Sequence, residues 1–275
     1  MWSRRRGPRA HPEPWSRQRL LGMLIGAAAA TTALITGLGF AAVYAFTAAV
    51  TPTPSTSMPA ASAAPADVRD RIAAAPMASV DPRAGYTPES AAGQPATIAI
   101  PLPADDDLGE AEVPVGFPHT TTGAIGQWAA IERRVVEAMD LRVAGQVHAA
   151  WVQPGGPTVE QWDLTRNVQE FLVAARQGGV VKDASTLVSA TPVGAMVKGV
   201  DGPDWVLVCV LLDVRAVVSI EARMGYGLCS RMVWVRDRWM VAPGAQPATA
   251  PSAWPGSATA SRVGWLAWTD QVGAR

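Results

Sequence analysis

Residues 205–235, WVLVCVLLDVRAVVSIEARMGYGLCSRMVWV, decide the fold class of this chain. The stretch is dense in valine, leucine, methionine and tryptophan, and it predicts two strands, 205–218 and 223–235. Strands joined by so few residues pair as an antiparallel hairpin, here centred near Ser219. The turn Val-Ser-Ile-Glu lacks the residues that hairpin turns favour, so the sequence leaves the register of this pairing open.

The strand pattern continues on both sides of this hairpin. Residues 187–200 precede it and have the period of two that is typical of a strand. They are followed by Gly202-Pro203, which predicts a turn. Another strand, 239–242, comes after a tight turn at Arg236-Asp237. The carboxyl-terminal half of the domain is therefore predicted to be a run of antiparallel strands.

Three helices are predicted ahead of these strands. The first runs from Thr121 or Thr122, either of which can cap it, to Met139, with apolar residues at helical spacing. The second covers 141–151, and the third starts at a capping box at 158–161 and stops at Gly178-Gly179. Helices followed by strands indicate an α+β domain, with the helices packed on one face of an antiparallel sheet.

Cys209 and Cys229 lie on the two strands of the central hairpin. A hairpin centred near Ser219 places them opposite each other, where a disulfide persists in an oxidising compartment. The alternative is that both are small buried residues with free thiols. Two cysteines exclude a disulfide-dense scaffold and a four-cysteine zinc site, and we expect no metal and no cofactor.

The chain carries no recognisable catalytic motif, and we expect no catalytic residue and no enzyme. His148 falls on the second helix and is expected to be structural, while His119 is expected to help cap the first helix. An isomerase or dehydratase would need an acid or base aimed into a cavity, and Asp213 and His148 are the only candidates.

Upstream of the domain lies a segment that can span a membrane. Residues 1–19 are basic, with six arginines and one glutamate, and residues 20–48 carry no charge. About 20 helical residues cross a bilayer, and the arginines predict a cytoplasmic N-terminus and an extracytoplasmic domain. The alternative is a signal peptide that is cleaved. The predicted membrane residues include Leu20, Leu24, Ile25, Leu34, Ile35, Leu38, Phe40, Val43 and Phe46.

Small residues recur at every fourth position of this segment. Gly22, Gly26 and Ala30 form a stripe that lets two helices approach closely and so favours self-association. The alternative is that an Ala/Gly-rich span produces this spacing by chance.

Pro/Ala-rich segments flank the predicted domain, which we place at 116–245. Residues 49–115 are predicted to be an acidic, disordered linker, with a short helix at 67–75 and a single strand or extended arm at 96–103. Residues 246–275 are predicted to be a Pro/Ala-rich segment and tail. The tail tryptophans are candidates for an exposed interface or for packing on the chain's own domain: Trp254, Trp265 and Trp268.

Several short motifs recur through the predicted domain: Gly116-Phe-Pro-His-Thr120, Gly155-Gly156 with Trp162-x-Leu-Thr-Arg166, Val197-Lys-Gly199 with Gly202-Pro-Asp-Trp205, Tyr226-Gly-x-Cys-x-Arg-Met232, and Arg238-Trp-Met240 with Ala242-Pro-Gly244. In these motifs the chain resembles a family of actinobacterial proteins encoded on conjugative and integrative elements. The layout is also similar to the inner-membrane assembly factors of type IV secretion systems, whose external domain is a curved cone with the fold of nuclear transport factor 2.

These resemblances imply a non-enzymatic, single-pass cell-membrane protein that assembles with other conjugation or secretion proteins and with copies of itself. Direct binding of nucleic acid is not expected, because 23 basic residues are balanced by 23 acidic ones. The alternatives are an extracytoplasmic module that binds a lipid or another small molecule in the cone and, less favoured, an enzyme.

Overall fold

The strands predicted from the sequence form the centre of a six-stranded sheet. In a computed structural model of the chain, which describes residues 67–103 and 107–271, the strand order is β1–β6–β2–β3–β4–β5. Four consecutive strands pair antiparallel: β2 (Leu187–Val200), β3 (Trp205–Val217), β4 (Glu221–Val235) and β5 (Arg238–Val241). The register places Cys209 opposite Cys229, as a hairpin centred on Ser219 requires.

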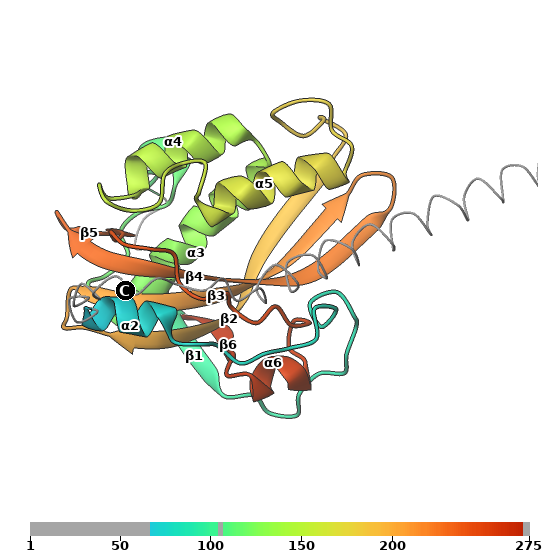
Figure 1. Cartoon of the computed structure of the whole chain (residues 1–275). Helices are drawn as coiled ribbons and strands as arrows, with labels where there is room; N and C mark the ends of the chain where they lie inside the picture. Colours follow the sequence, from blue (N-terminus) through green and yellow to red (C-terminus); the bar gives the residue numbers. More distant parts are fainter. Residues whose placement is uncertain (1–66, 104–106, 272–275) are drawn as a thin grey trace, which may run out of the picture. The chain divides into compact units, whose positions relative to one another are not determined.

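Three helices cover one face of the sheet, as predicted: α3 (Thr121–Ala138), α4 (Leu141–Trp151) and α5 (Asp163–Ala174) (Figure 1). The cap of α3 is Thr120 rather than Thr121 or Thr122, since its Oγ1 accepts a hydrogen bond from the Gly123 N–H at 3.0 Å. The α+β prediction is confirmed.

The third helix begins later than the capping box predicted. Residues 158–161 form a turn, in which the Trp162 N–H donates to the Thr158 carbonyl oxygen, and α5 starts at Asp163. The Asp163 N–H donates to the side-chain oxygen of Gln246 at 2.7 Å, so a distant glutamine replaces the predicted local cap.

The sheet is mixed and starts before the helices, which corrects the predicted antiparallel sheet that follows them. Strand β1 (Thr97–Pro101) precedes α3 and pairs in parallel with β6 (Leu266–Gln271), which itself pairs with β2 at Gly194 and Ala195. Burial explains this arrangement, because Ile100 is fully buried in the core beneath the helices.

The described part of the predicted linker is ordered, which corrects the disordered linker, and the short helix predicted at 67–75 and the strand predicted at 96–103 are both present. It contains α2 (Val68–Ala74), β1 and the short 3₁₀ helix η1 (Glu110–Glu112). Helix α2 is fastened to the sheet, since the Lys198 Nζ donates to the Ala73 carbonyl oxygen at 2.7 Å and Asp70 pairs with Arg231 at 2.7 Å. The described domain therefore includes residues 67–271 apart from the gap at 104–106.

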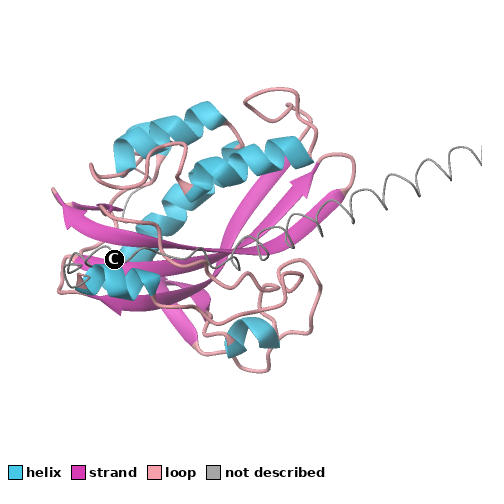
Figure 2. Cartoon of the chain, viewed as in Figure 1, coloured by secondary structure: helices cyan, strands magenta, loops and turns pink. Residues whose placement is uncertain are grey.

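A second apolar layer lies on the other face of the sheet. Successive residues of β3 alternate between the two layers, with Val206, Val208 and Val210 toward α3–α5 and Leu207 and Cys209 on the opposite side. That opposite side is covered by α2, by α6 (Ala258–Arg262) and by the segment after β5 (Figure 2). Burial on both faces explains why β3 reads as a continuous apolar run.

The predicted membrane segment and the basic tail lie outside the described residues. This also holds for the membrane residues Leu20–Phe46 and for Gly22, Gly26 and Ala30 of the stripe. Among residues 67–103 and 107–271, no helix is both long and apolar enough to cross a bilayer.

Candidate functional site

The concave side of the sheet is filled by tryptophans from the helices and strands. Trp128, Trp151, Trp162 and Trp239 are each at most 2% exposed. Three of their indole N–H groups donate to backbone carbonyl oxygens: Trp128 to Leu228 at 3.4 Å, Trp151 to Glu110 at 3.0 Å and Trp239 to Pro118 at 2.9 Å. All four side chains are therefore core residues, and the indole N–H groups of Trp128, Trp151 and Trp239 are satisfied.

A carboxyl group is buried within this aromatic core. Glu132 on α3 is fully buried, and neither carboxyl oxygen has a hydrogen-bond partner among the described residues. Burial raises the pKa of Glu132 well above its usual value, and the neighbouring Trp128 side chain offsets only part of this effect. The protonated form is therefore favoured.

Tyr226 and Asn167 extend this buried polar set toward the surface. The Asn167 Nδ2 of α5 donates to the Tyr226 hydroxyl on β4. Burial raises the pKa of the Tyr226 phenol, and the nearby carboxyl groups of Glu132, Asp163 and Glu170 raise it further. None of Glu132, Tyr226 and Asn167 was singled out from the sequence as a site residue.

Two depressions flank the core. A slot of about 150 Å³ lies between α5, β4 and residues 247–252 and reaches Tyr226 and Asn167. A larger groove of about 610 Å³ runs beside α3 and is lined by Phe117, Arg133, Pro192 and Trp268 among others. The groove is bounded by α3 on one side and by the ends of β1, β2 and β6 on the other.

The cysteines form a disulfide, which the sequence left open. The Cα atoms of Cys209 and Cys229 are 3.9 Å apart on directly paired positions of β3 and β4. Both side chains are at most 6% exposed and lie in the second apolar layer. The bridge therefore joins the two central strands inside the domain.

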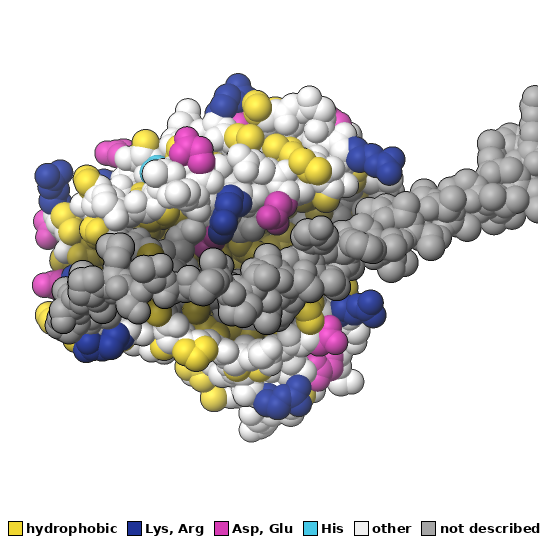
Figure 3. Space-filling view, viewed as in Figure 1, with side chains coloured by type: hydrophobic (Ala, Val, Ile, Leu, Met, Phe, Trp, Pro, Cys, Tyr) yellow, Lys and Arg dark blue, Asp and Glu magenta, His cyan; other side chains and the backbone are white. Residues whose placement is uncertain are grey.

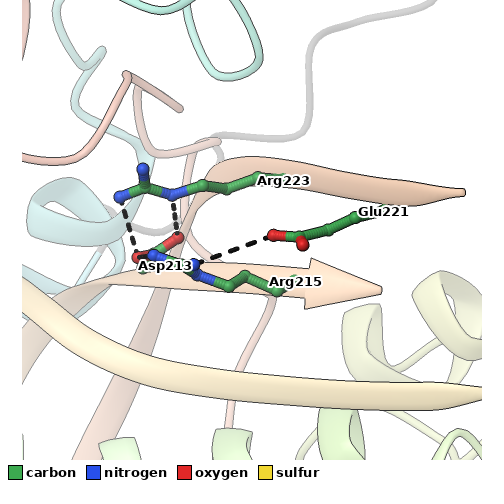
Figure 4. A network of polar contacts seen from close by, with 4 residues as sticks. All are labelled: Asp213, Arg215, Glu221 and Arg223. Carbon is green, nitrogen blue, oxygen red and sulfur yellow. Dashed lines mark hydrogen bonds and ion pairs between the residues drawn. The ribbon is translucent and has the colours of Figure 1, made fainter. Parts of the chain in front are cut away.

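The two residues considered for acid–base chemistry are held by other contacts. The Asp213 carboxylate receives two hydrogen bonds from Arg223, at 2.7 and 2.9 Å, and pairs with Arg215 at 3.4 Å (Figure 4). His148 lies with its Nε2 2.8 Å from the Pro157 carbonyl oxygen. Neither residue lines the slot or the groove.

His119 does not cap α3, which corrects the prediction. Its Nε2 lies 2.8 Å from an Asp204 carboxylate oxygen, and its ring stacks on Trp234 with a centroid separation of 4.4 Å. His119 therefore joins the start of α3 to the turn between β2 and β3.

The three tail tryptophans differ in their exposure. Trp265 is 4% exposed, and its indole N–H donates to the Pro251 carbonyl oxygen at 2.9 Å, so of the two alternatives it packs on the chain's own domain. Gly227 on β4 leaves the space that this indole fills, since a Cβ there would lie 2.9 Å from the Trp265 ring. Trp254 stacks with Arg223 at 4.6 Å, and Trp268 lines the groove, so both are partly accessible.

Exposed aliphatic side chains gather at one end of the sheet, which we call the apolar end. Figure 3 shows hydrophobic side chains over α5 and the loop after it, which form part of this end. Half of the large hydrophobic residues that are exposed in the described chain belong to it: Val173, Val180, Val181, Leu187, Val217, Val218 and Ile220.

Backbone and side-chain contacts bring these segments together. Leu187 pairs with Val217 across β2 and β3. The Lys182 N–H donates to the Met139 carbonyl oxygen at the end of α3, and the Asp183 N–H donates to the Gln177 side chain just after α5. The apolar end thus comprises the end of α5, the loop after it and the turn between β3 and β4, and Val217 lies on the face of β3 that points away from the helices.

No family model, no curated protein and no solved structure matches this chain. The likeness to mobile-element proteins therefore stays a prediction from sequence motifs, and the function has to be inferred from the geometry.

Proposed function

We propose that this chain is a non-enzymatic, single-pass membrane component of a conjugation or type IV secretion apparatus. Its α+β domain, which we assign to the cone of the nuclear transport factor 2 type, acts as a protein–protein assembly module. One observation carries this proposal: the concave face is packed with buried tryptophans, while exposed aliphatic side chains gather at the apolar end. Clustered exposed apolar groups are typical of interaction surfaces.

The disulfide supports an extracytoplasmic location for the domain. Buried disulfides persist in oxidising compartments and are rare in the cytosol. The basic residues of the N-terminal tail predict a cytoplasmic tail under the positive-inside rule, and with that topology Cys209 and Cys229 lie on the other side of the membrane.

The proposal is tested by purifying the tagged full-length chain from solubilised donor membranes and identifying its bound proteins by mass spectrometry. The control is a chain that ends at residue 66, which keeps the predicted membrane segment and lacks the domain. We expect channel-forming membrane proteins or a secretion ATPase with the full chain only. Recovery of the full chain alone, or the same proteins with the control, would contradict an assembly role for the domain.

The groove beside α3 favours a second candidate, an extracytoplasmic module that binds a small molecule or lipid. Its volume of about 610 Å³ lies within the range of ligand pockets, and Phe117 and Trp268 offer apolar contacts. Native mass spectrometry of the purified chain tests this candidate. A stoichiometric ligand that is lost in Trp268→Ala would support it, and a chain with only its own mass would exclude a retained ligand.

A further inference from the structure

The slot between α5, β4 and residues 247–252 has the size of a site for one small molecule. Leu228 and Cys229 of β4 line it, and each is at most 9% exposed, so packed residues of the sheet form one side. Its volume of about 150 Å³ is below the range of pockets for drug-sized ligands. A cavity of about this volume holds one molecule of the size of benzene. The slot therefore limits a ligand to about six non-hydrogen atoms.

Two polar side chains that line the slot leave a hydrogen-bond donor available. The Asn167 Nδ2 donates to the Tyr226 hydroxyl, and both residues line the slot. This bond occupies a lone pair of the hydroxyl oxygen, so the phenol proton remains available for another acceptor. The phenol keeps this proton at neutral pH, because burial and the nearby carboxyl groups raise the pKa of Tyr226. The slot therefore offers an O–H donor to an oxygen atom of a ligand.

The first residue of α5 adds an acceptor to the same slot. Asp163 lines it, and one of its carboxylate oxygens accepts a hydrogen bond from Arg166. A carboxylate accepts several hydrogen bonds at once, so Asp163 can also accept an N–H from a ligand. The Asp163 carboxyl is close enough to Tyr226 to raise the pKa of the phenol. A donor and an acceptor are thus both within reach of one small molecule.

The charges around the slot select a neutral ligand. Beyond burial, the carboxyl groups of Asp163 and Glu170 raise the pKa of Tyr226, so an anion beside this phenol would meet the same repulsion. A cation would compete with Arg166, which already pairs with Asp163. A carboxamide is neutral and carries both a carbonyl oxygen and an N–H. It therefore matches the donor and the acceptor of the slot without either penalty.

We propose that the slot is a binding site for a small neutral carboxamide or lactam. Its carbonyl oxygen accepts a hydrogen bond from the Tyr226 hydroxyl, and its N–H donates to the Asp163 carboxylate. Asn167 is a positioning residue, because the bond that it donates turns the phenol proton toward the ligand. The slot shares no lining residue with the groove beside α3, and the inference goes beyond the proposed assembly role.

Nuclear magnetic resonance of the full-length chain in detergent, with carbon-13 in its tyrosine rings, tests this site. The chain has three tyrosines, and Tyr226→Phe identifies the resonance of the one that lines the slot. The probe is 2-pyrrolidone, a water-soluble lactam of the size that the slot admits. Tyr86, which is 54% exposed, reports non-specific contact with the probe. Tyr44, in the predicted membrane segment, reports partition of the probe into detergent.

We expect only the Tyr226 resonance to shift, and to saturate with a dissociation constant in the millimolar range. Two charged probes of similar size, pyrrolidine as a cation and butanoate as an anion, should bind about tenfold more weakly or not at all. A Tyr226 resonance that does not shift, or three resonances that shift together, would overturn the proposal. Equal affinity for pyrrolidine or butanoate would overturn the assignment to a neutral amide.

The variant Asn167→Leu tests the positioning role, and Gln169→Leu is its matched control. Gln169 is also an amide on α5, but it is exposed and does not line the slot. We expect the dissociation constant for 2-pyrrolidone to rise about fivefold or more in Asn167→Leu and to be unchanged in Gln169→Leu. Equal affinity in Asn167→Leu and wild type would contradict this role. Circular dichroism checks the fold of both variants, and if Asn167→Leu does not fold, the wild-type titration with the three probes decides whether the site exists.

Discussion

Glu132 combines complete burial with unpartnered oxygens, a state that disfavours the ionised carboxylate in the folded domain. In the unfolded chain the same carboxyl ionises near its ordinary pKa of about 4.3. The raised pKa of the folded state means that Glu132 contributes stability below the unfolded pKa. This contribution is lost as the pH rises toward the folded pKa.

We therefore expect Glu132→Gln to remove a downward slope in the free energy of unfolding that begins above the unfolded pKa of about 4.3. The slope that one such group contributes is at most about 1.4 kcal/mol per pH unit. Urea denaturation at several pH values measures it. Glu170→Gln, an exposed glutamate on α5, is the control and should keep the wild-type slope. Equal slopes in Glu132→Gln and wild type would show that folding does not raise the pKa of Glu132.

The disulfide constrains the unfolded chain at two residues that are 20 positions apart. Loop-closure entropy for a loop of this length amounts to about 3 kcal/mol. We expect the free energy of unfolding of the double variant Cys209→Ala/Cys229→Ala to be lower by about 3 kcal/mol. The double variant should therefore unfold at a lower urea concentration than wild type. Reductant should lower the midpoint of wild type and leave that of the double variant unchanged. A wild-type midpoint that is insensitive to reductant would contradict the contribution of the bridge.

At the scale of elements, the segment after β5 depends on glycines of β4. Part of the outer edge of β4 is covered by residues 250–255, and a Cβ on Gly225 would lie 1.8 Å from the Ala253 carbonyl oxygen. The Gly225 N–H donates to the Gly85 carbonyl oxygen at 2.7 Å. Side chains at this position would push the covering segment off the strand, which is why a Pro/Ala-rich stretch is able to pack there.

Gly225→Ala is therefore expected to destabilise the domain by about 1–3 kcal/mol through overpacking. Gly145→Ala provides a control of opposite sign. Gly145 lies inside α4, and nothing is within 4 Å of its Cβ position, so alanine should stabilise the helix by about 0.5–1 kcal/mol. Thermal unfolding of both variants measures the difference. Equal changes in thermal stability for the two substitutions would mean that the segment after β5 shifts to make room for the added Cβ at residue 225.

At the scale of the whole molecule, the domain needs both of its flanking segments. A fragment with residues 64–275 contains α2, β1, α6 and β6 and should unfold cooperatively. A fragment limited to 116–245 lacks these elements and leaves the second apolar layer and Leu211 exposed to water. We expect no cooperative thermal transition by circular dichroism for the shorter fragment. A sharp transition there would show that 116–245 is sufficient.

The elements that sequence predicted well are those with strong local patterns. Strands β2 to β5 lie within two residues of their predicted bounds, because alternation and a doubly buried apolar run mark them clearly. Strand β1 was predicted only as a single strand or extended arm with no partner, and β6 was not predicted. Their stability comes from pairing between Thr97 and Ala267, which no local pattern reports.

The candidate site was harder to predict for a similar reason. Glu132 follows Trp128 by four residues and precedes Val135 by three, so it lies on the buried stripe of α3. Its neighbours Arg133 and Arg134 made it look like part of a charged exposed face. A charged residue at core spacing was the signal that sequence reasoning missed. Ile220, by contrast, sits in a turn whose exposure becomes evident only once the strands on both sides are paired.

The parallel pairing of β1 with β6 has a consequence for how the domain is made. A chain that emerges N-terminus first releases β1 well before β6, because Thr97 and Ala267 are separated by most of the domain. The hairpins from β2 to β5 are local and form early. Until the last residues arrive, Ile98 and Ile100 have no partner strand and the nascent domain stays open at that edge. The interval between synthesis of β1 and synthesis of β6 therefore sets how long a newly made chain needs protection from aggregation.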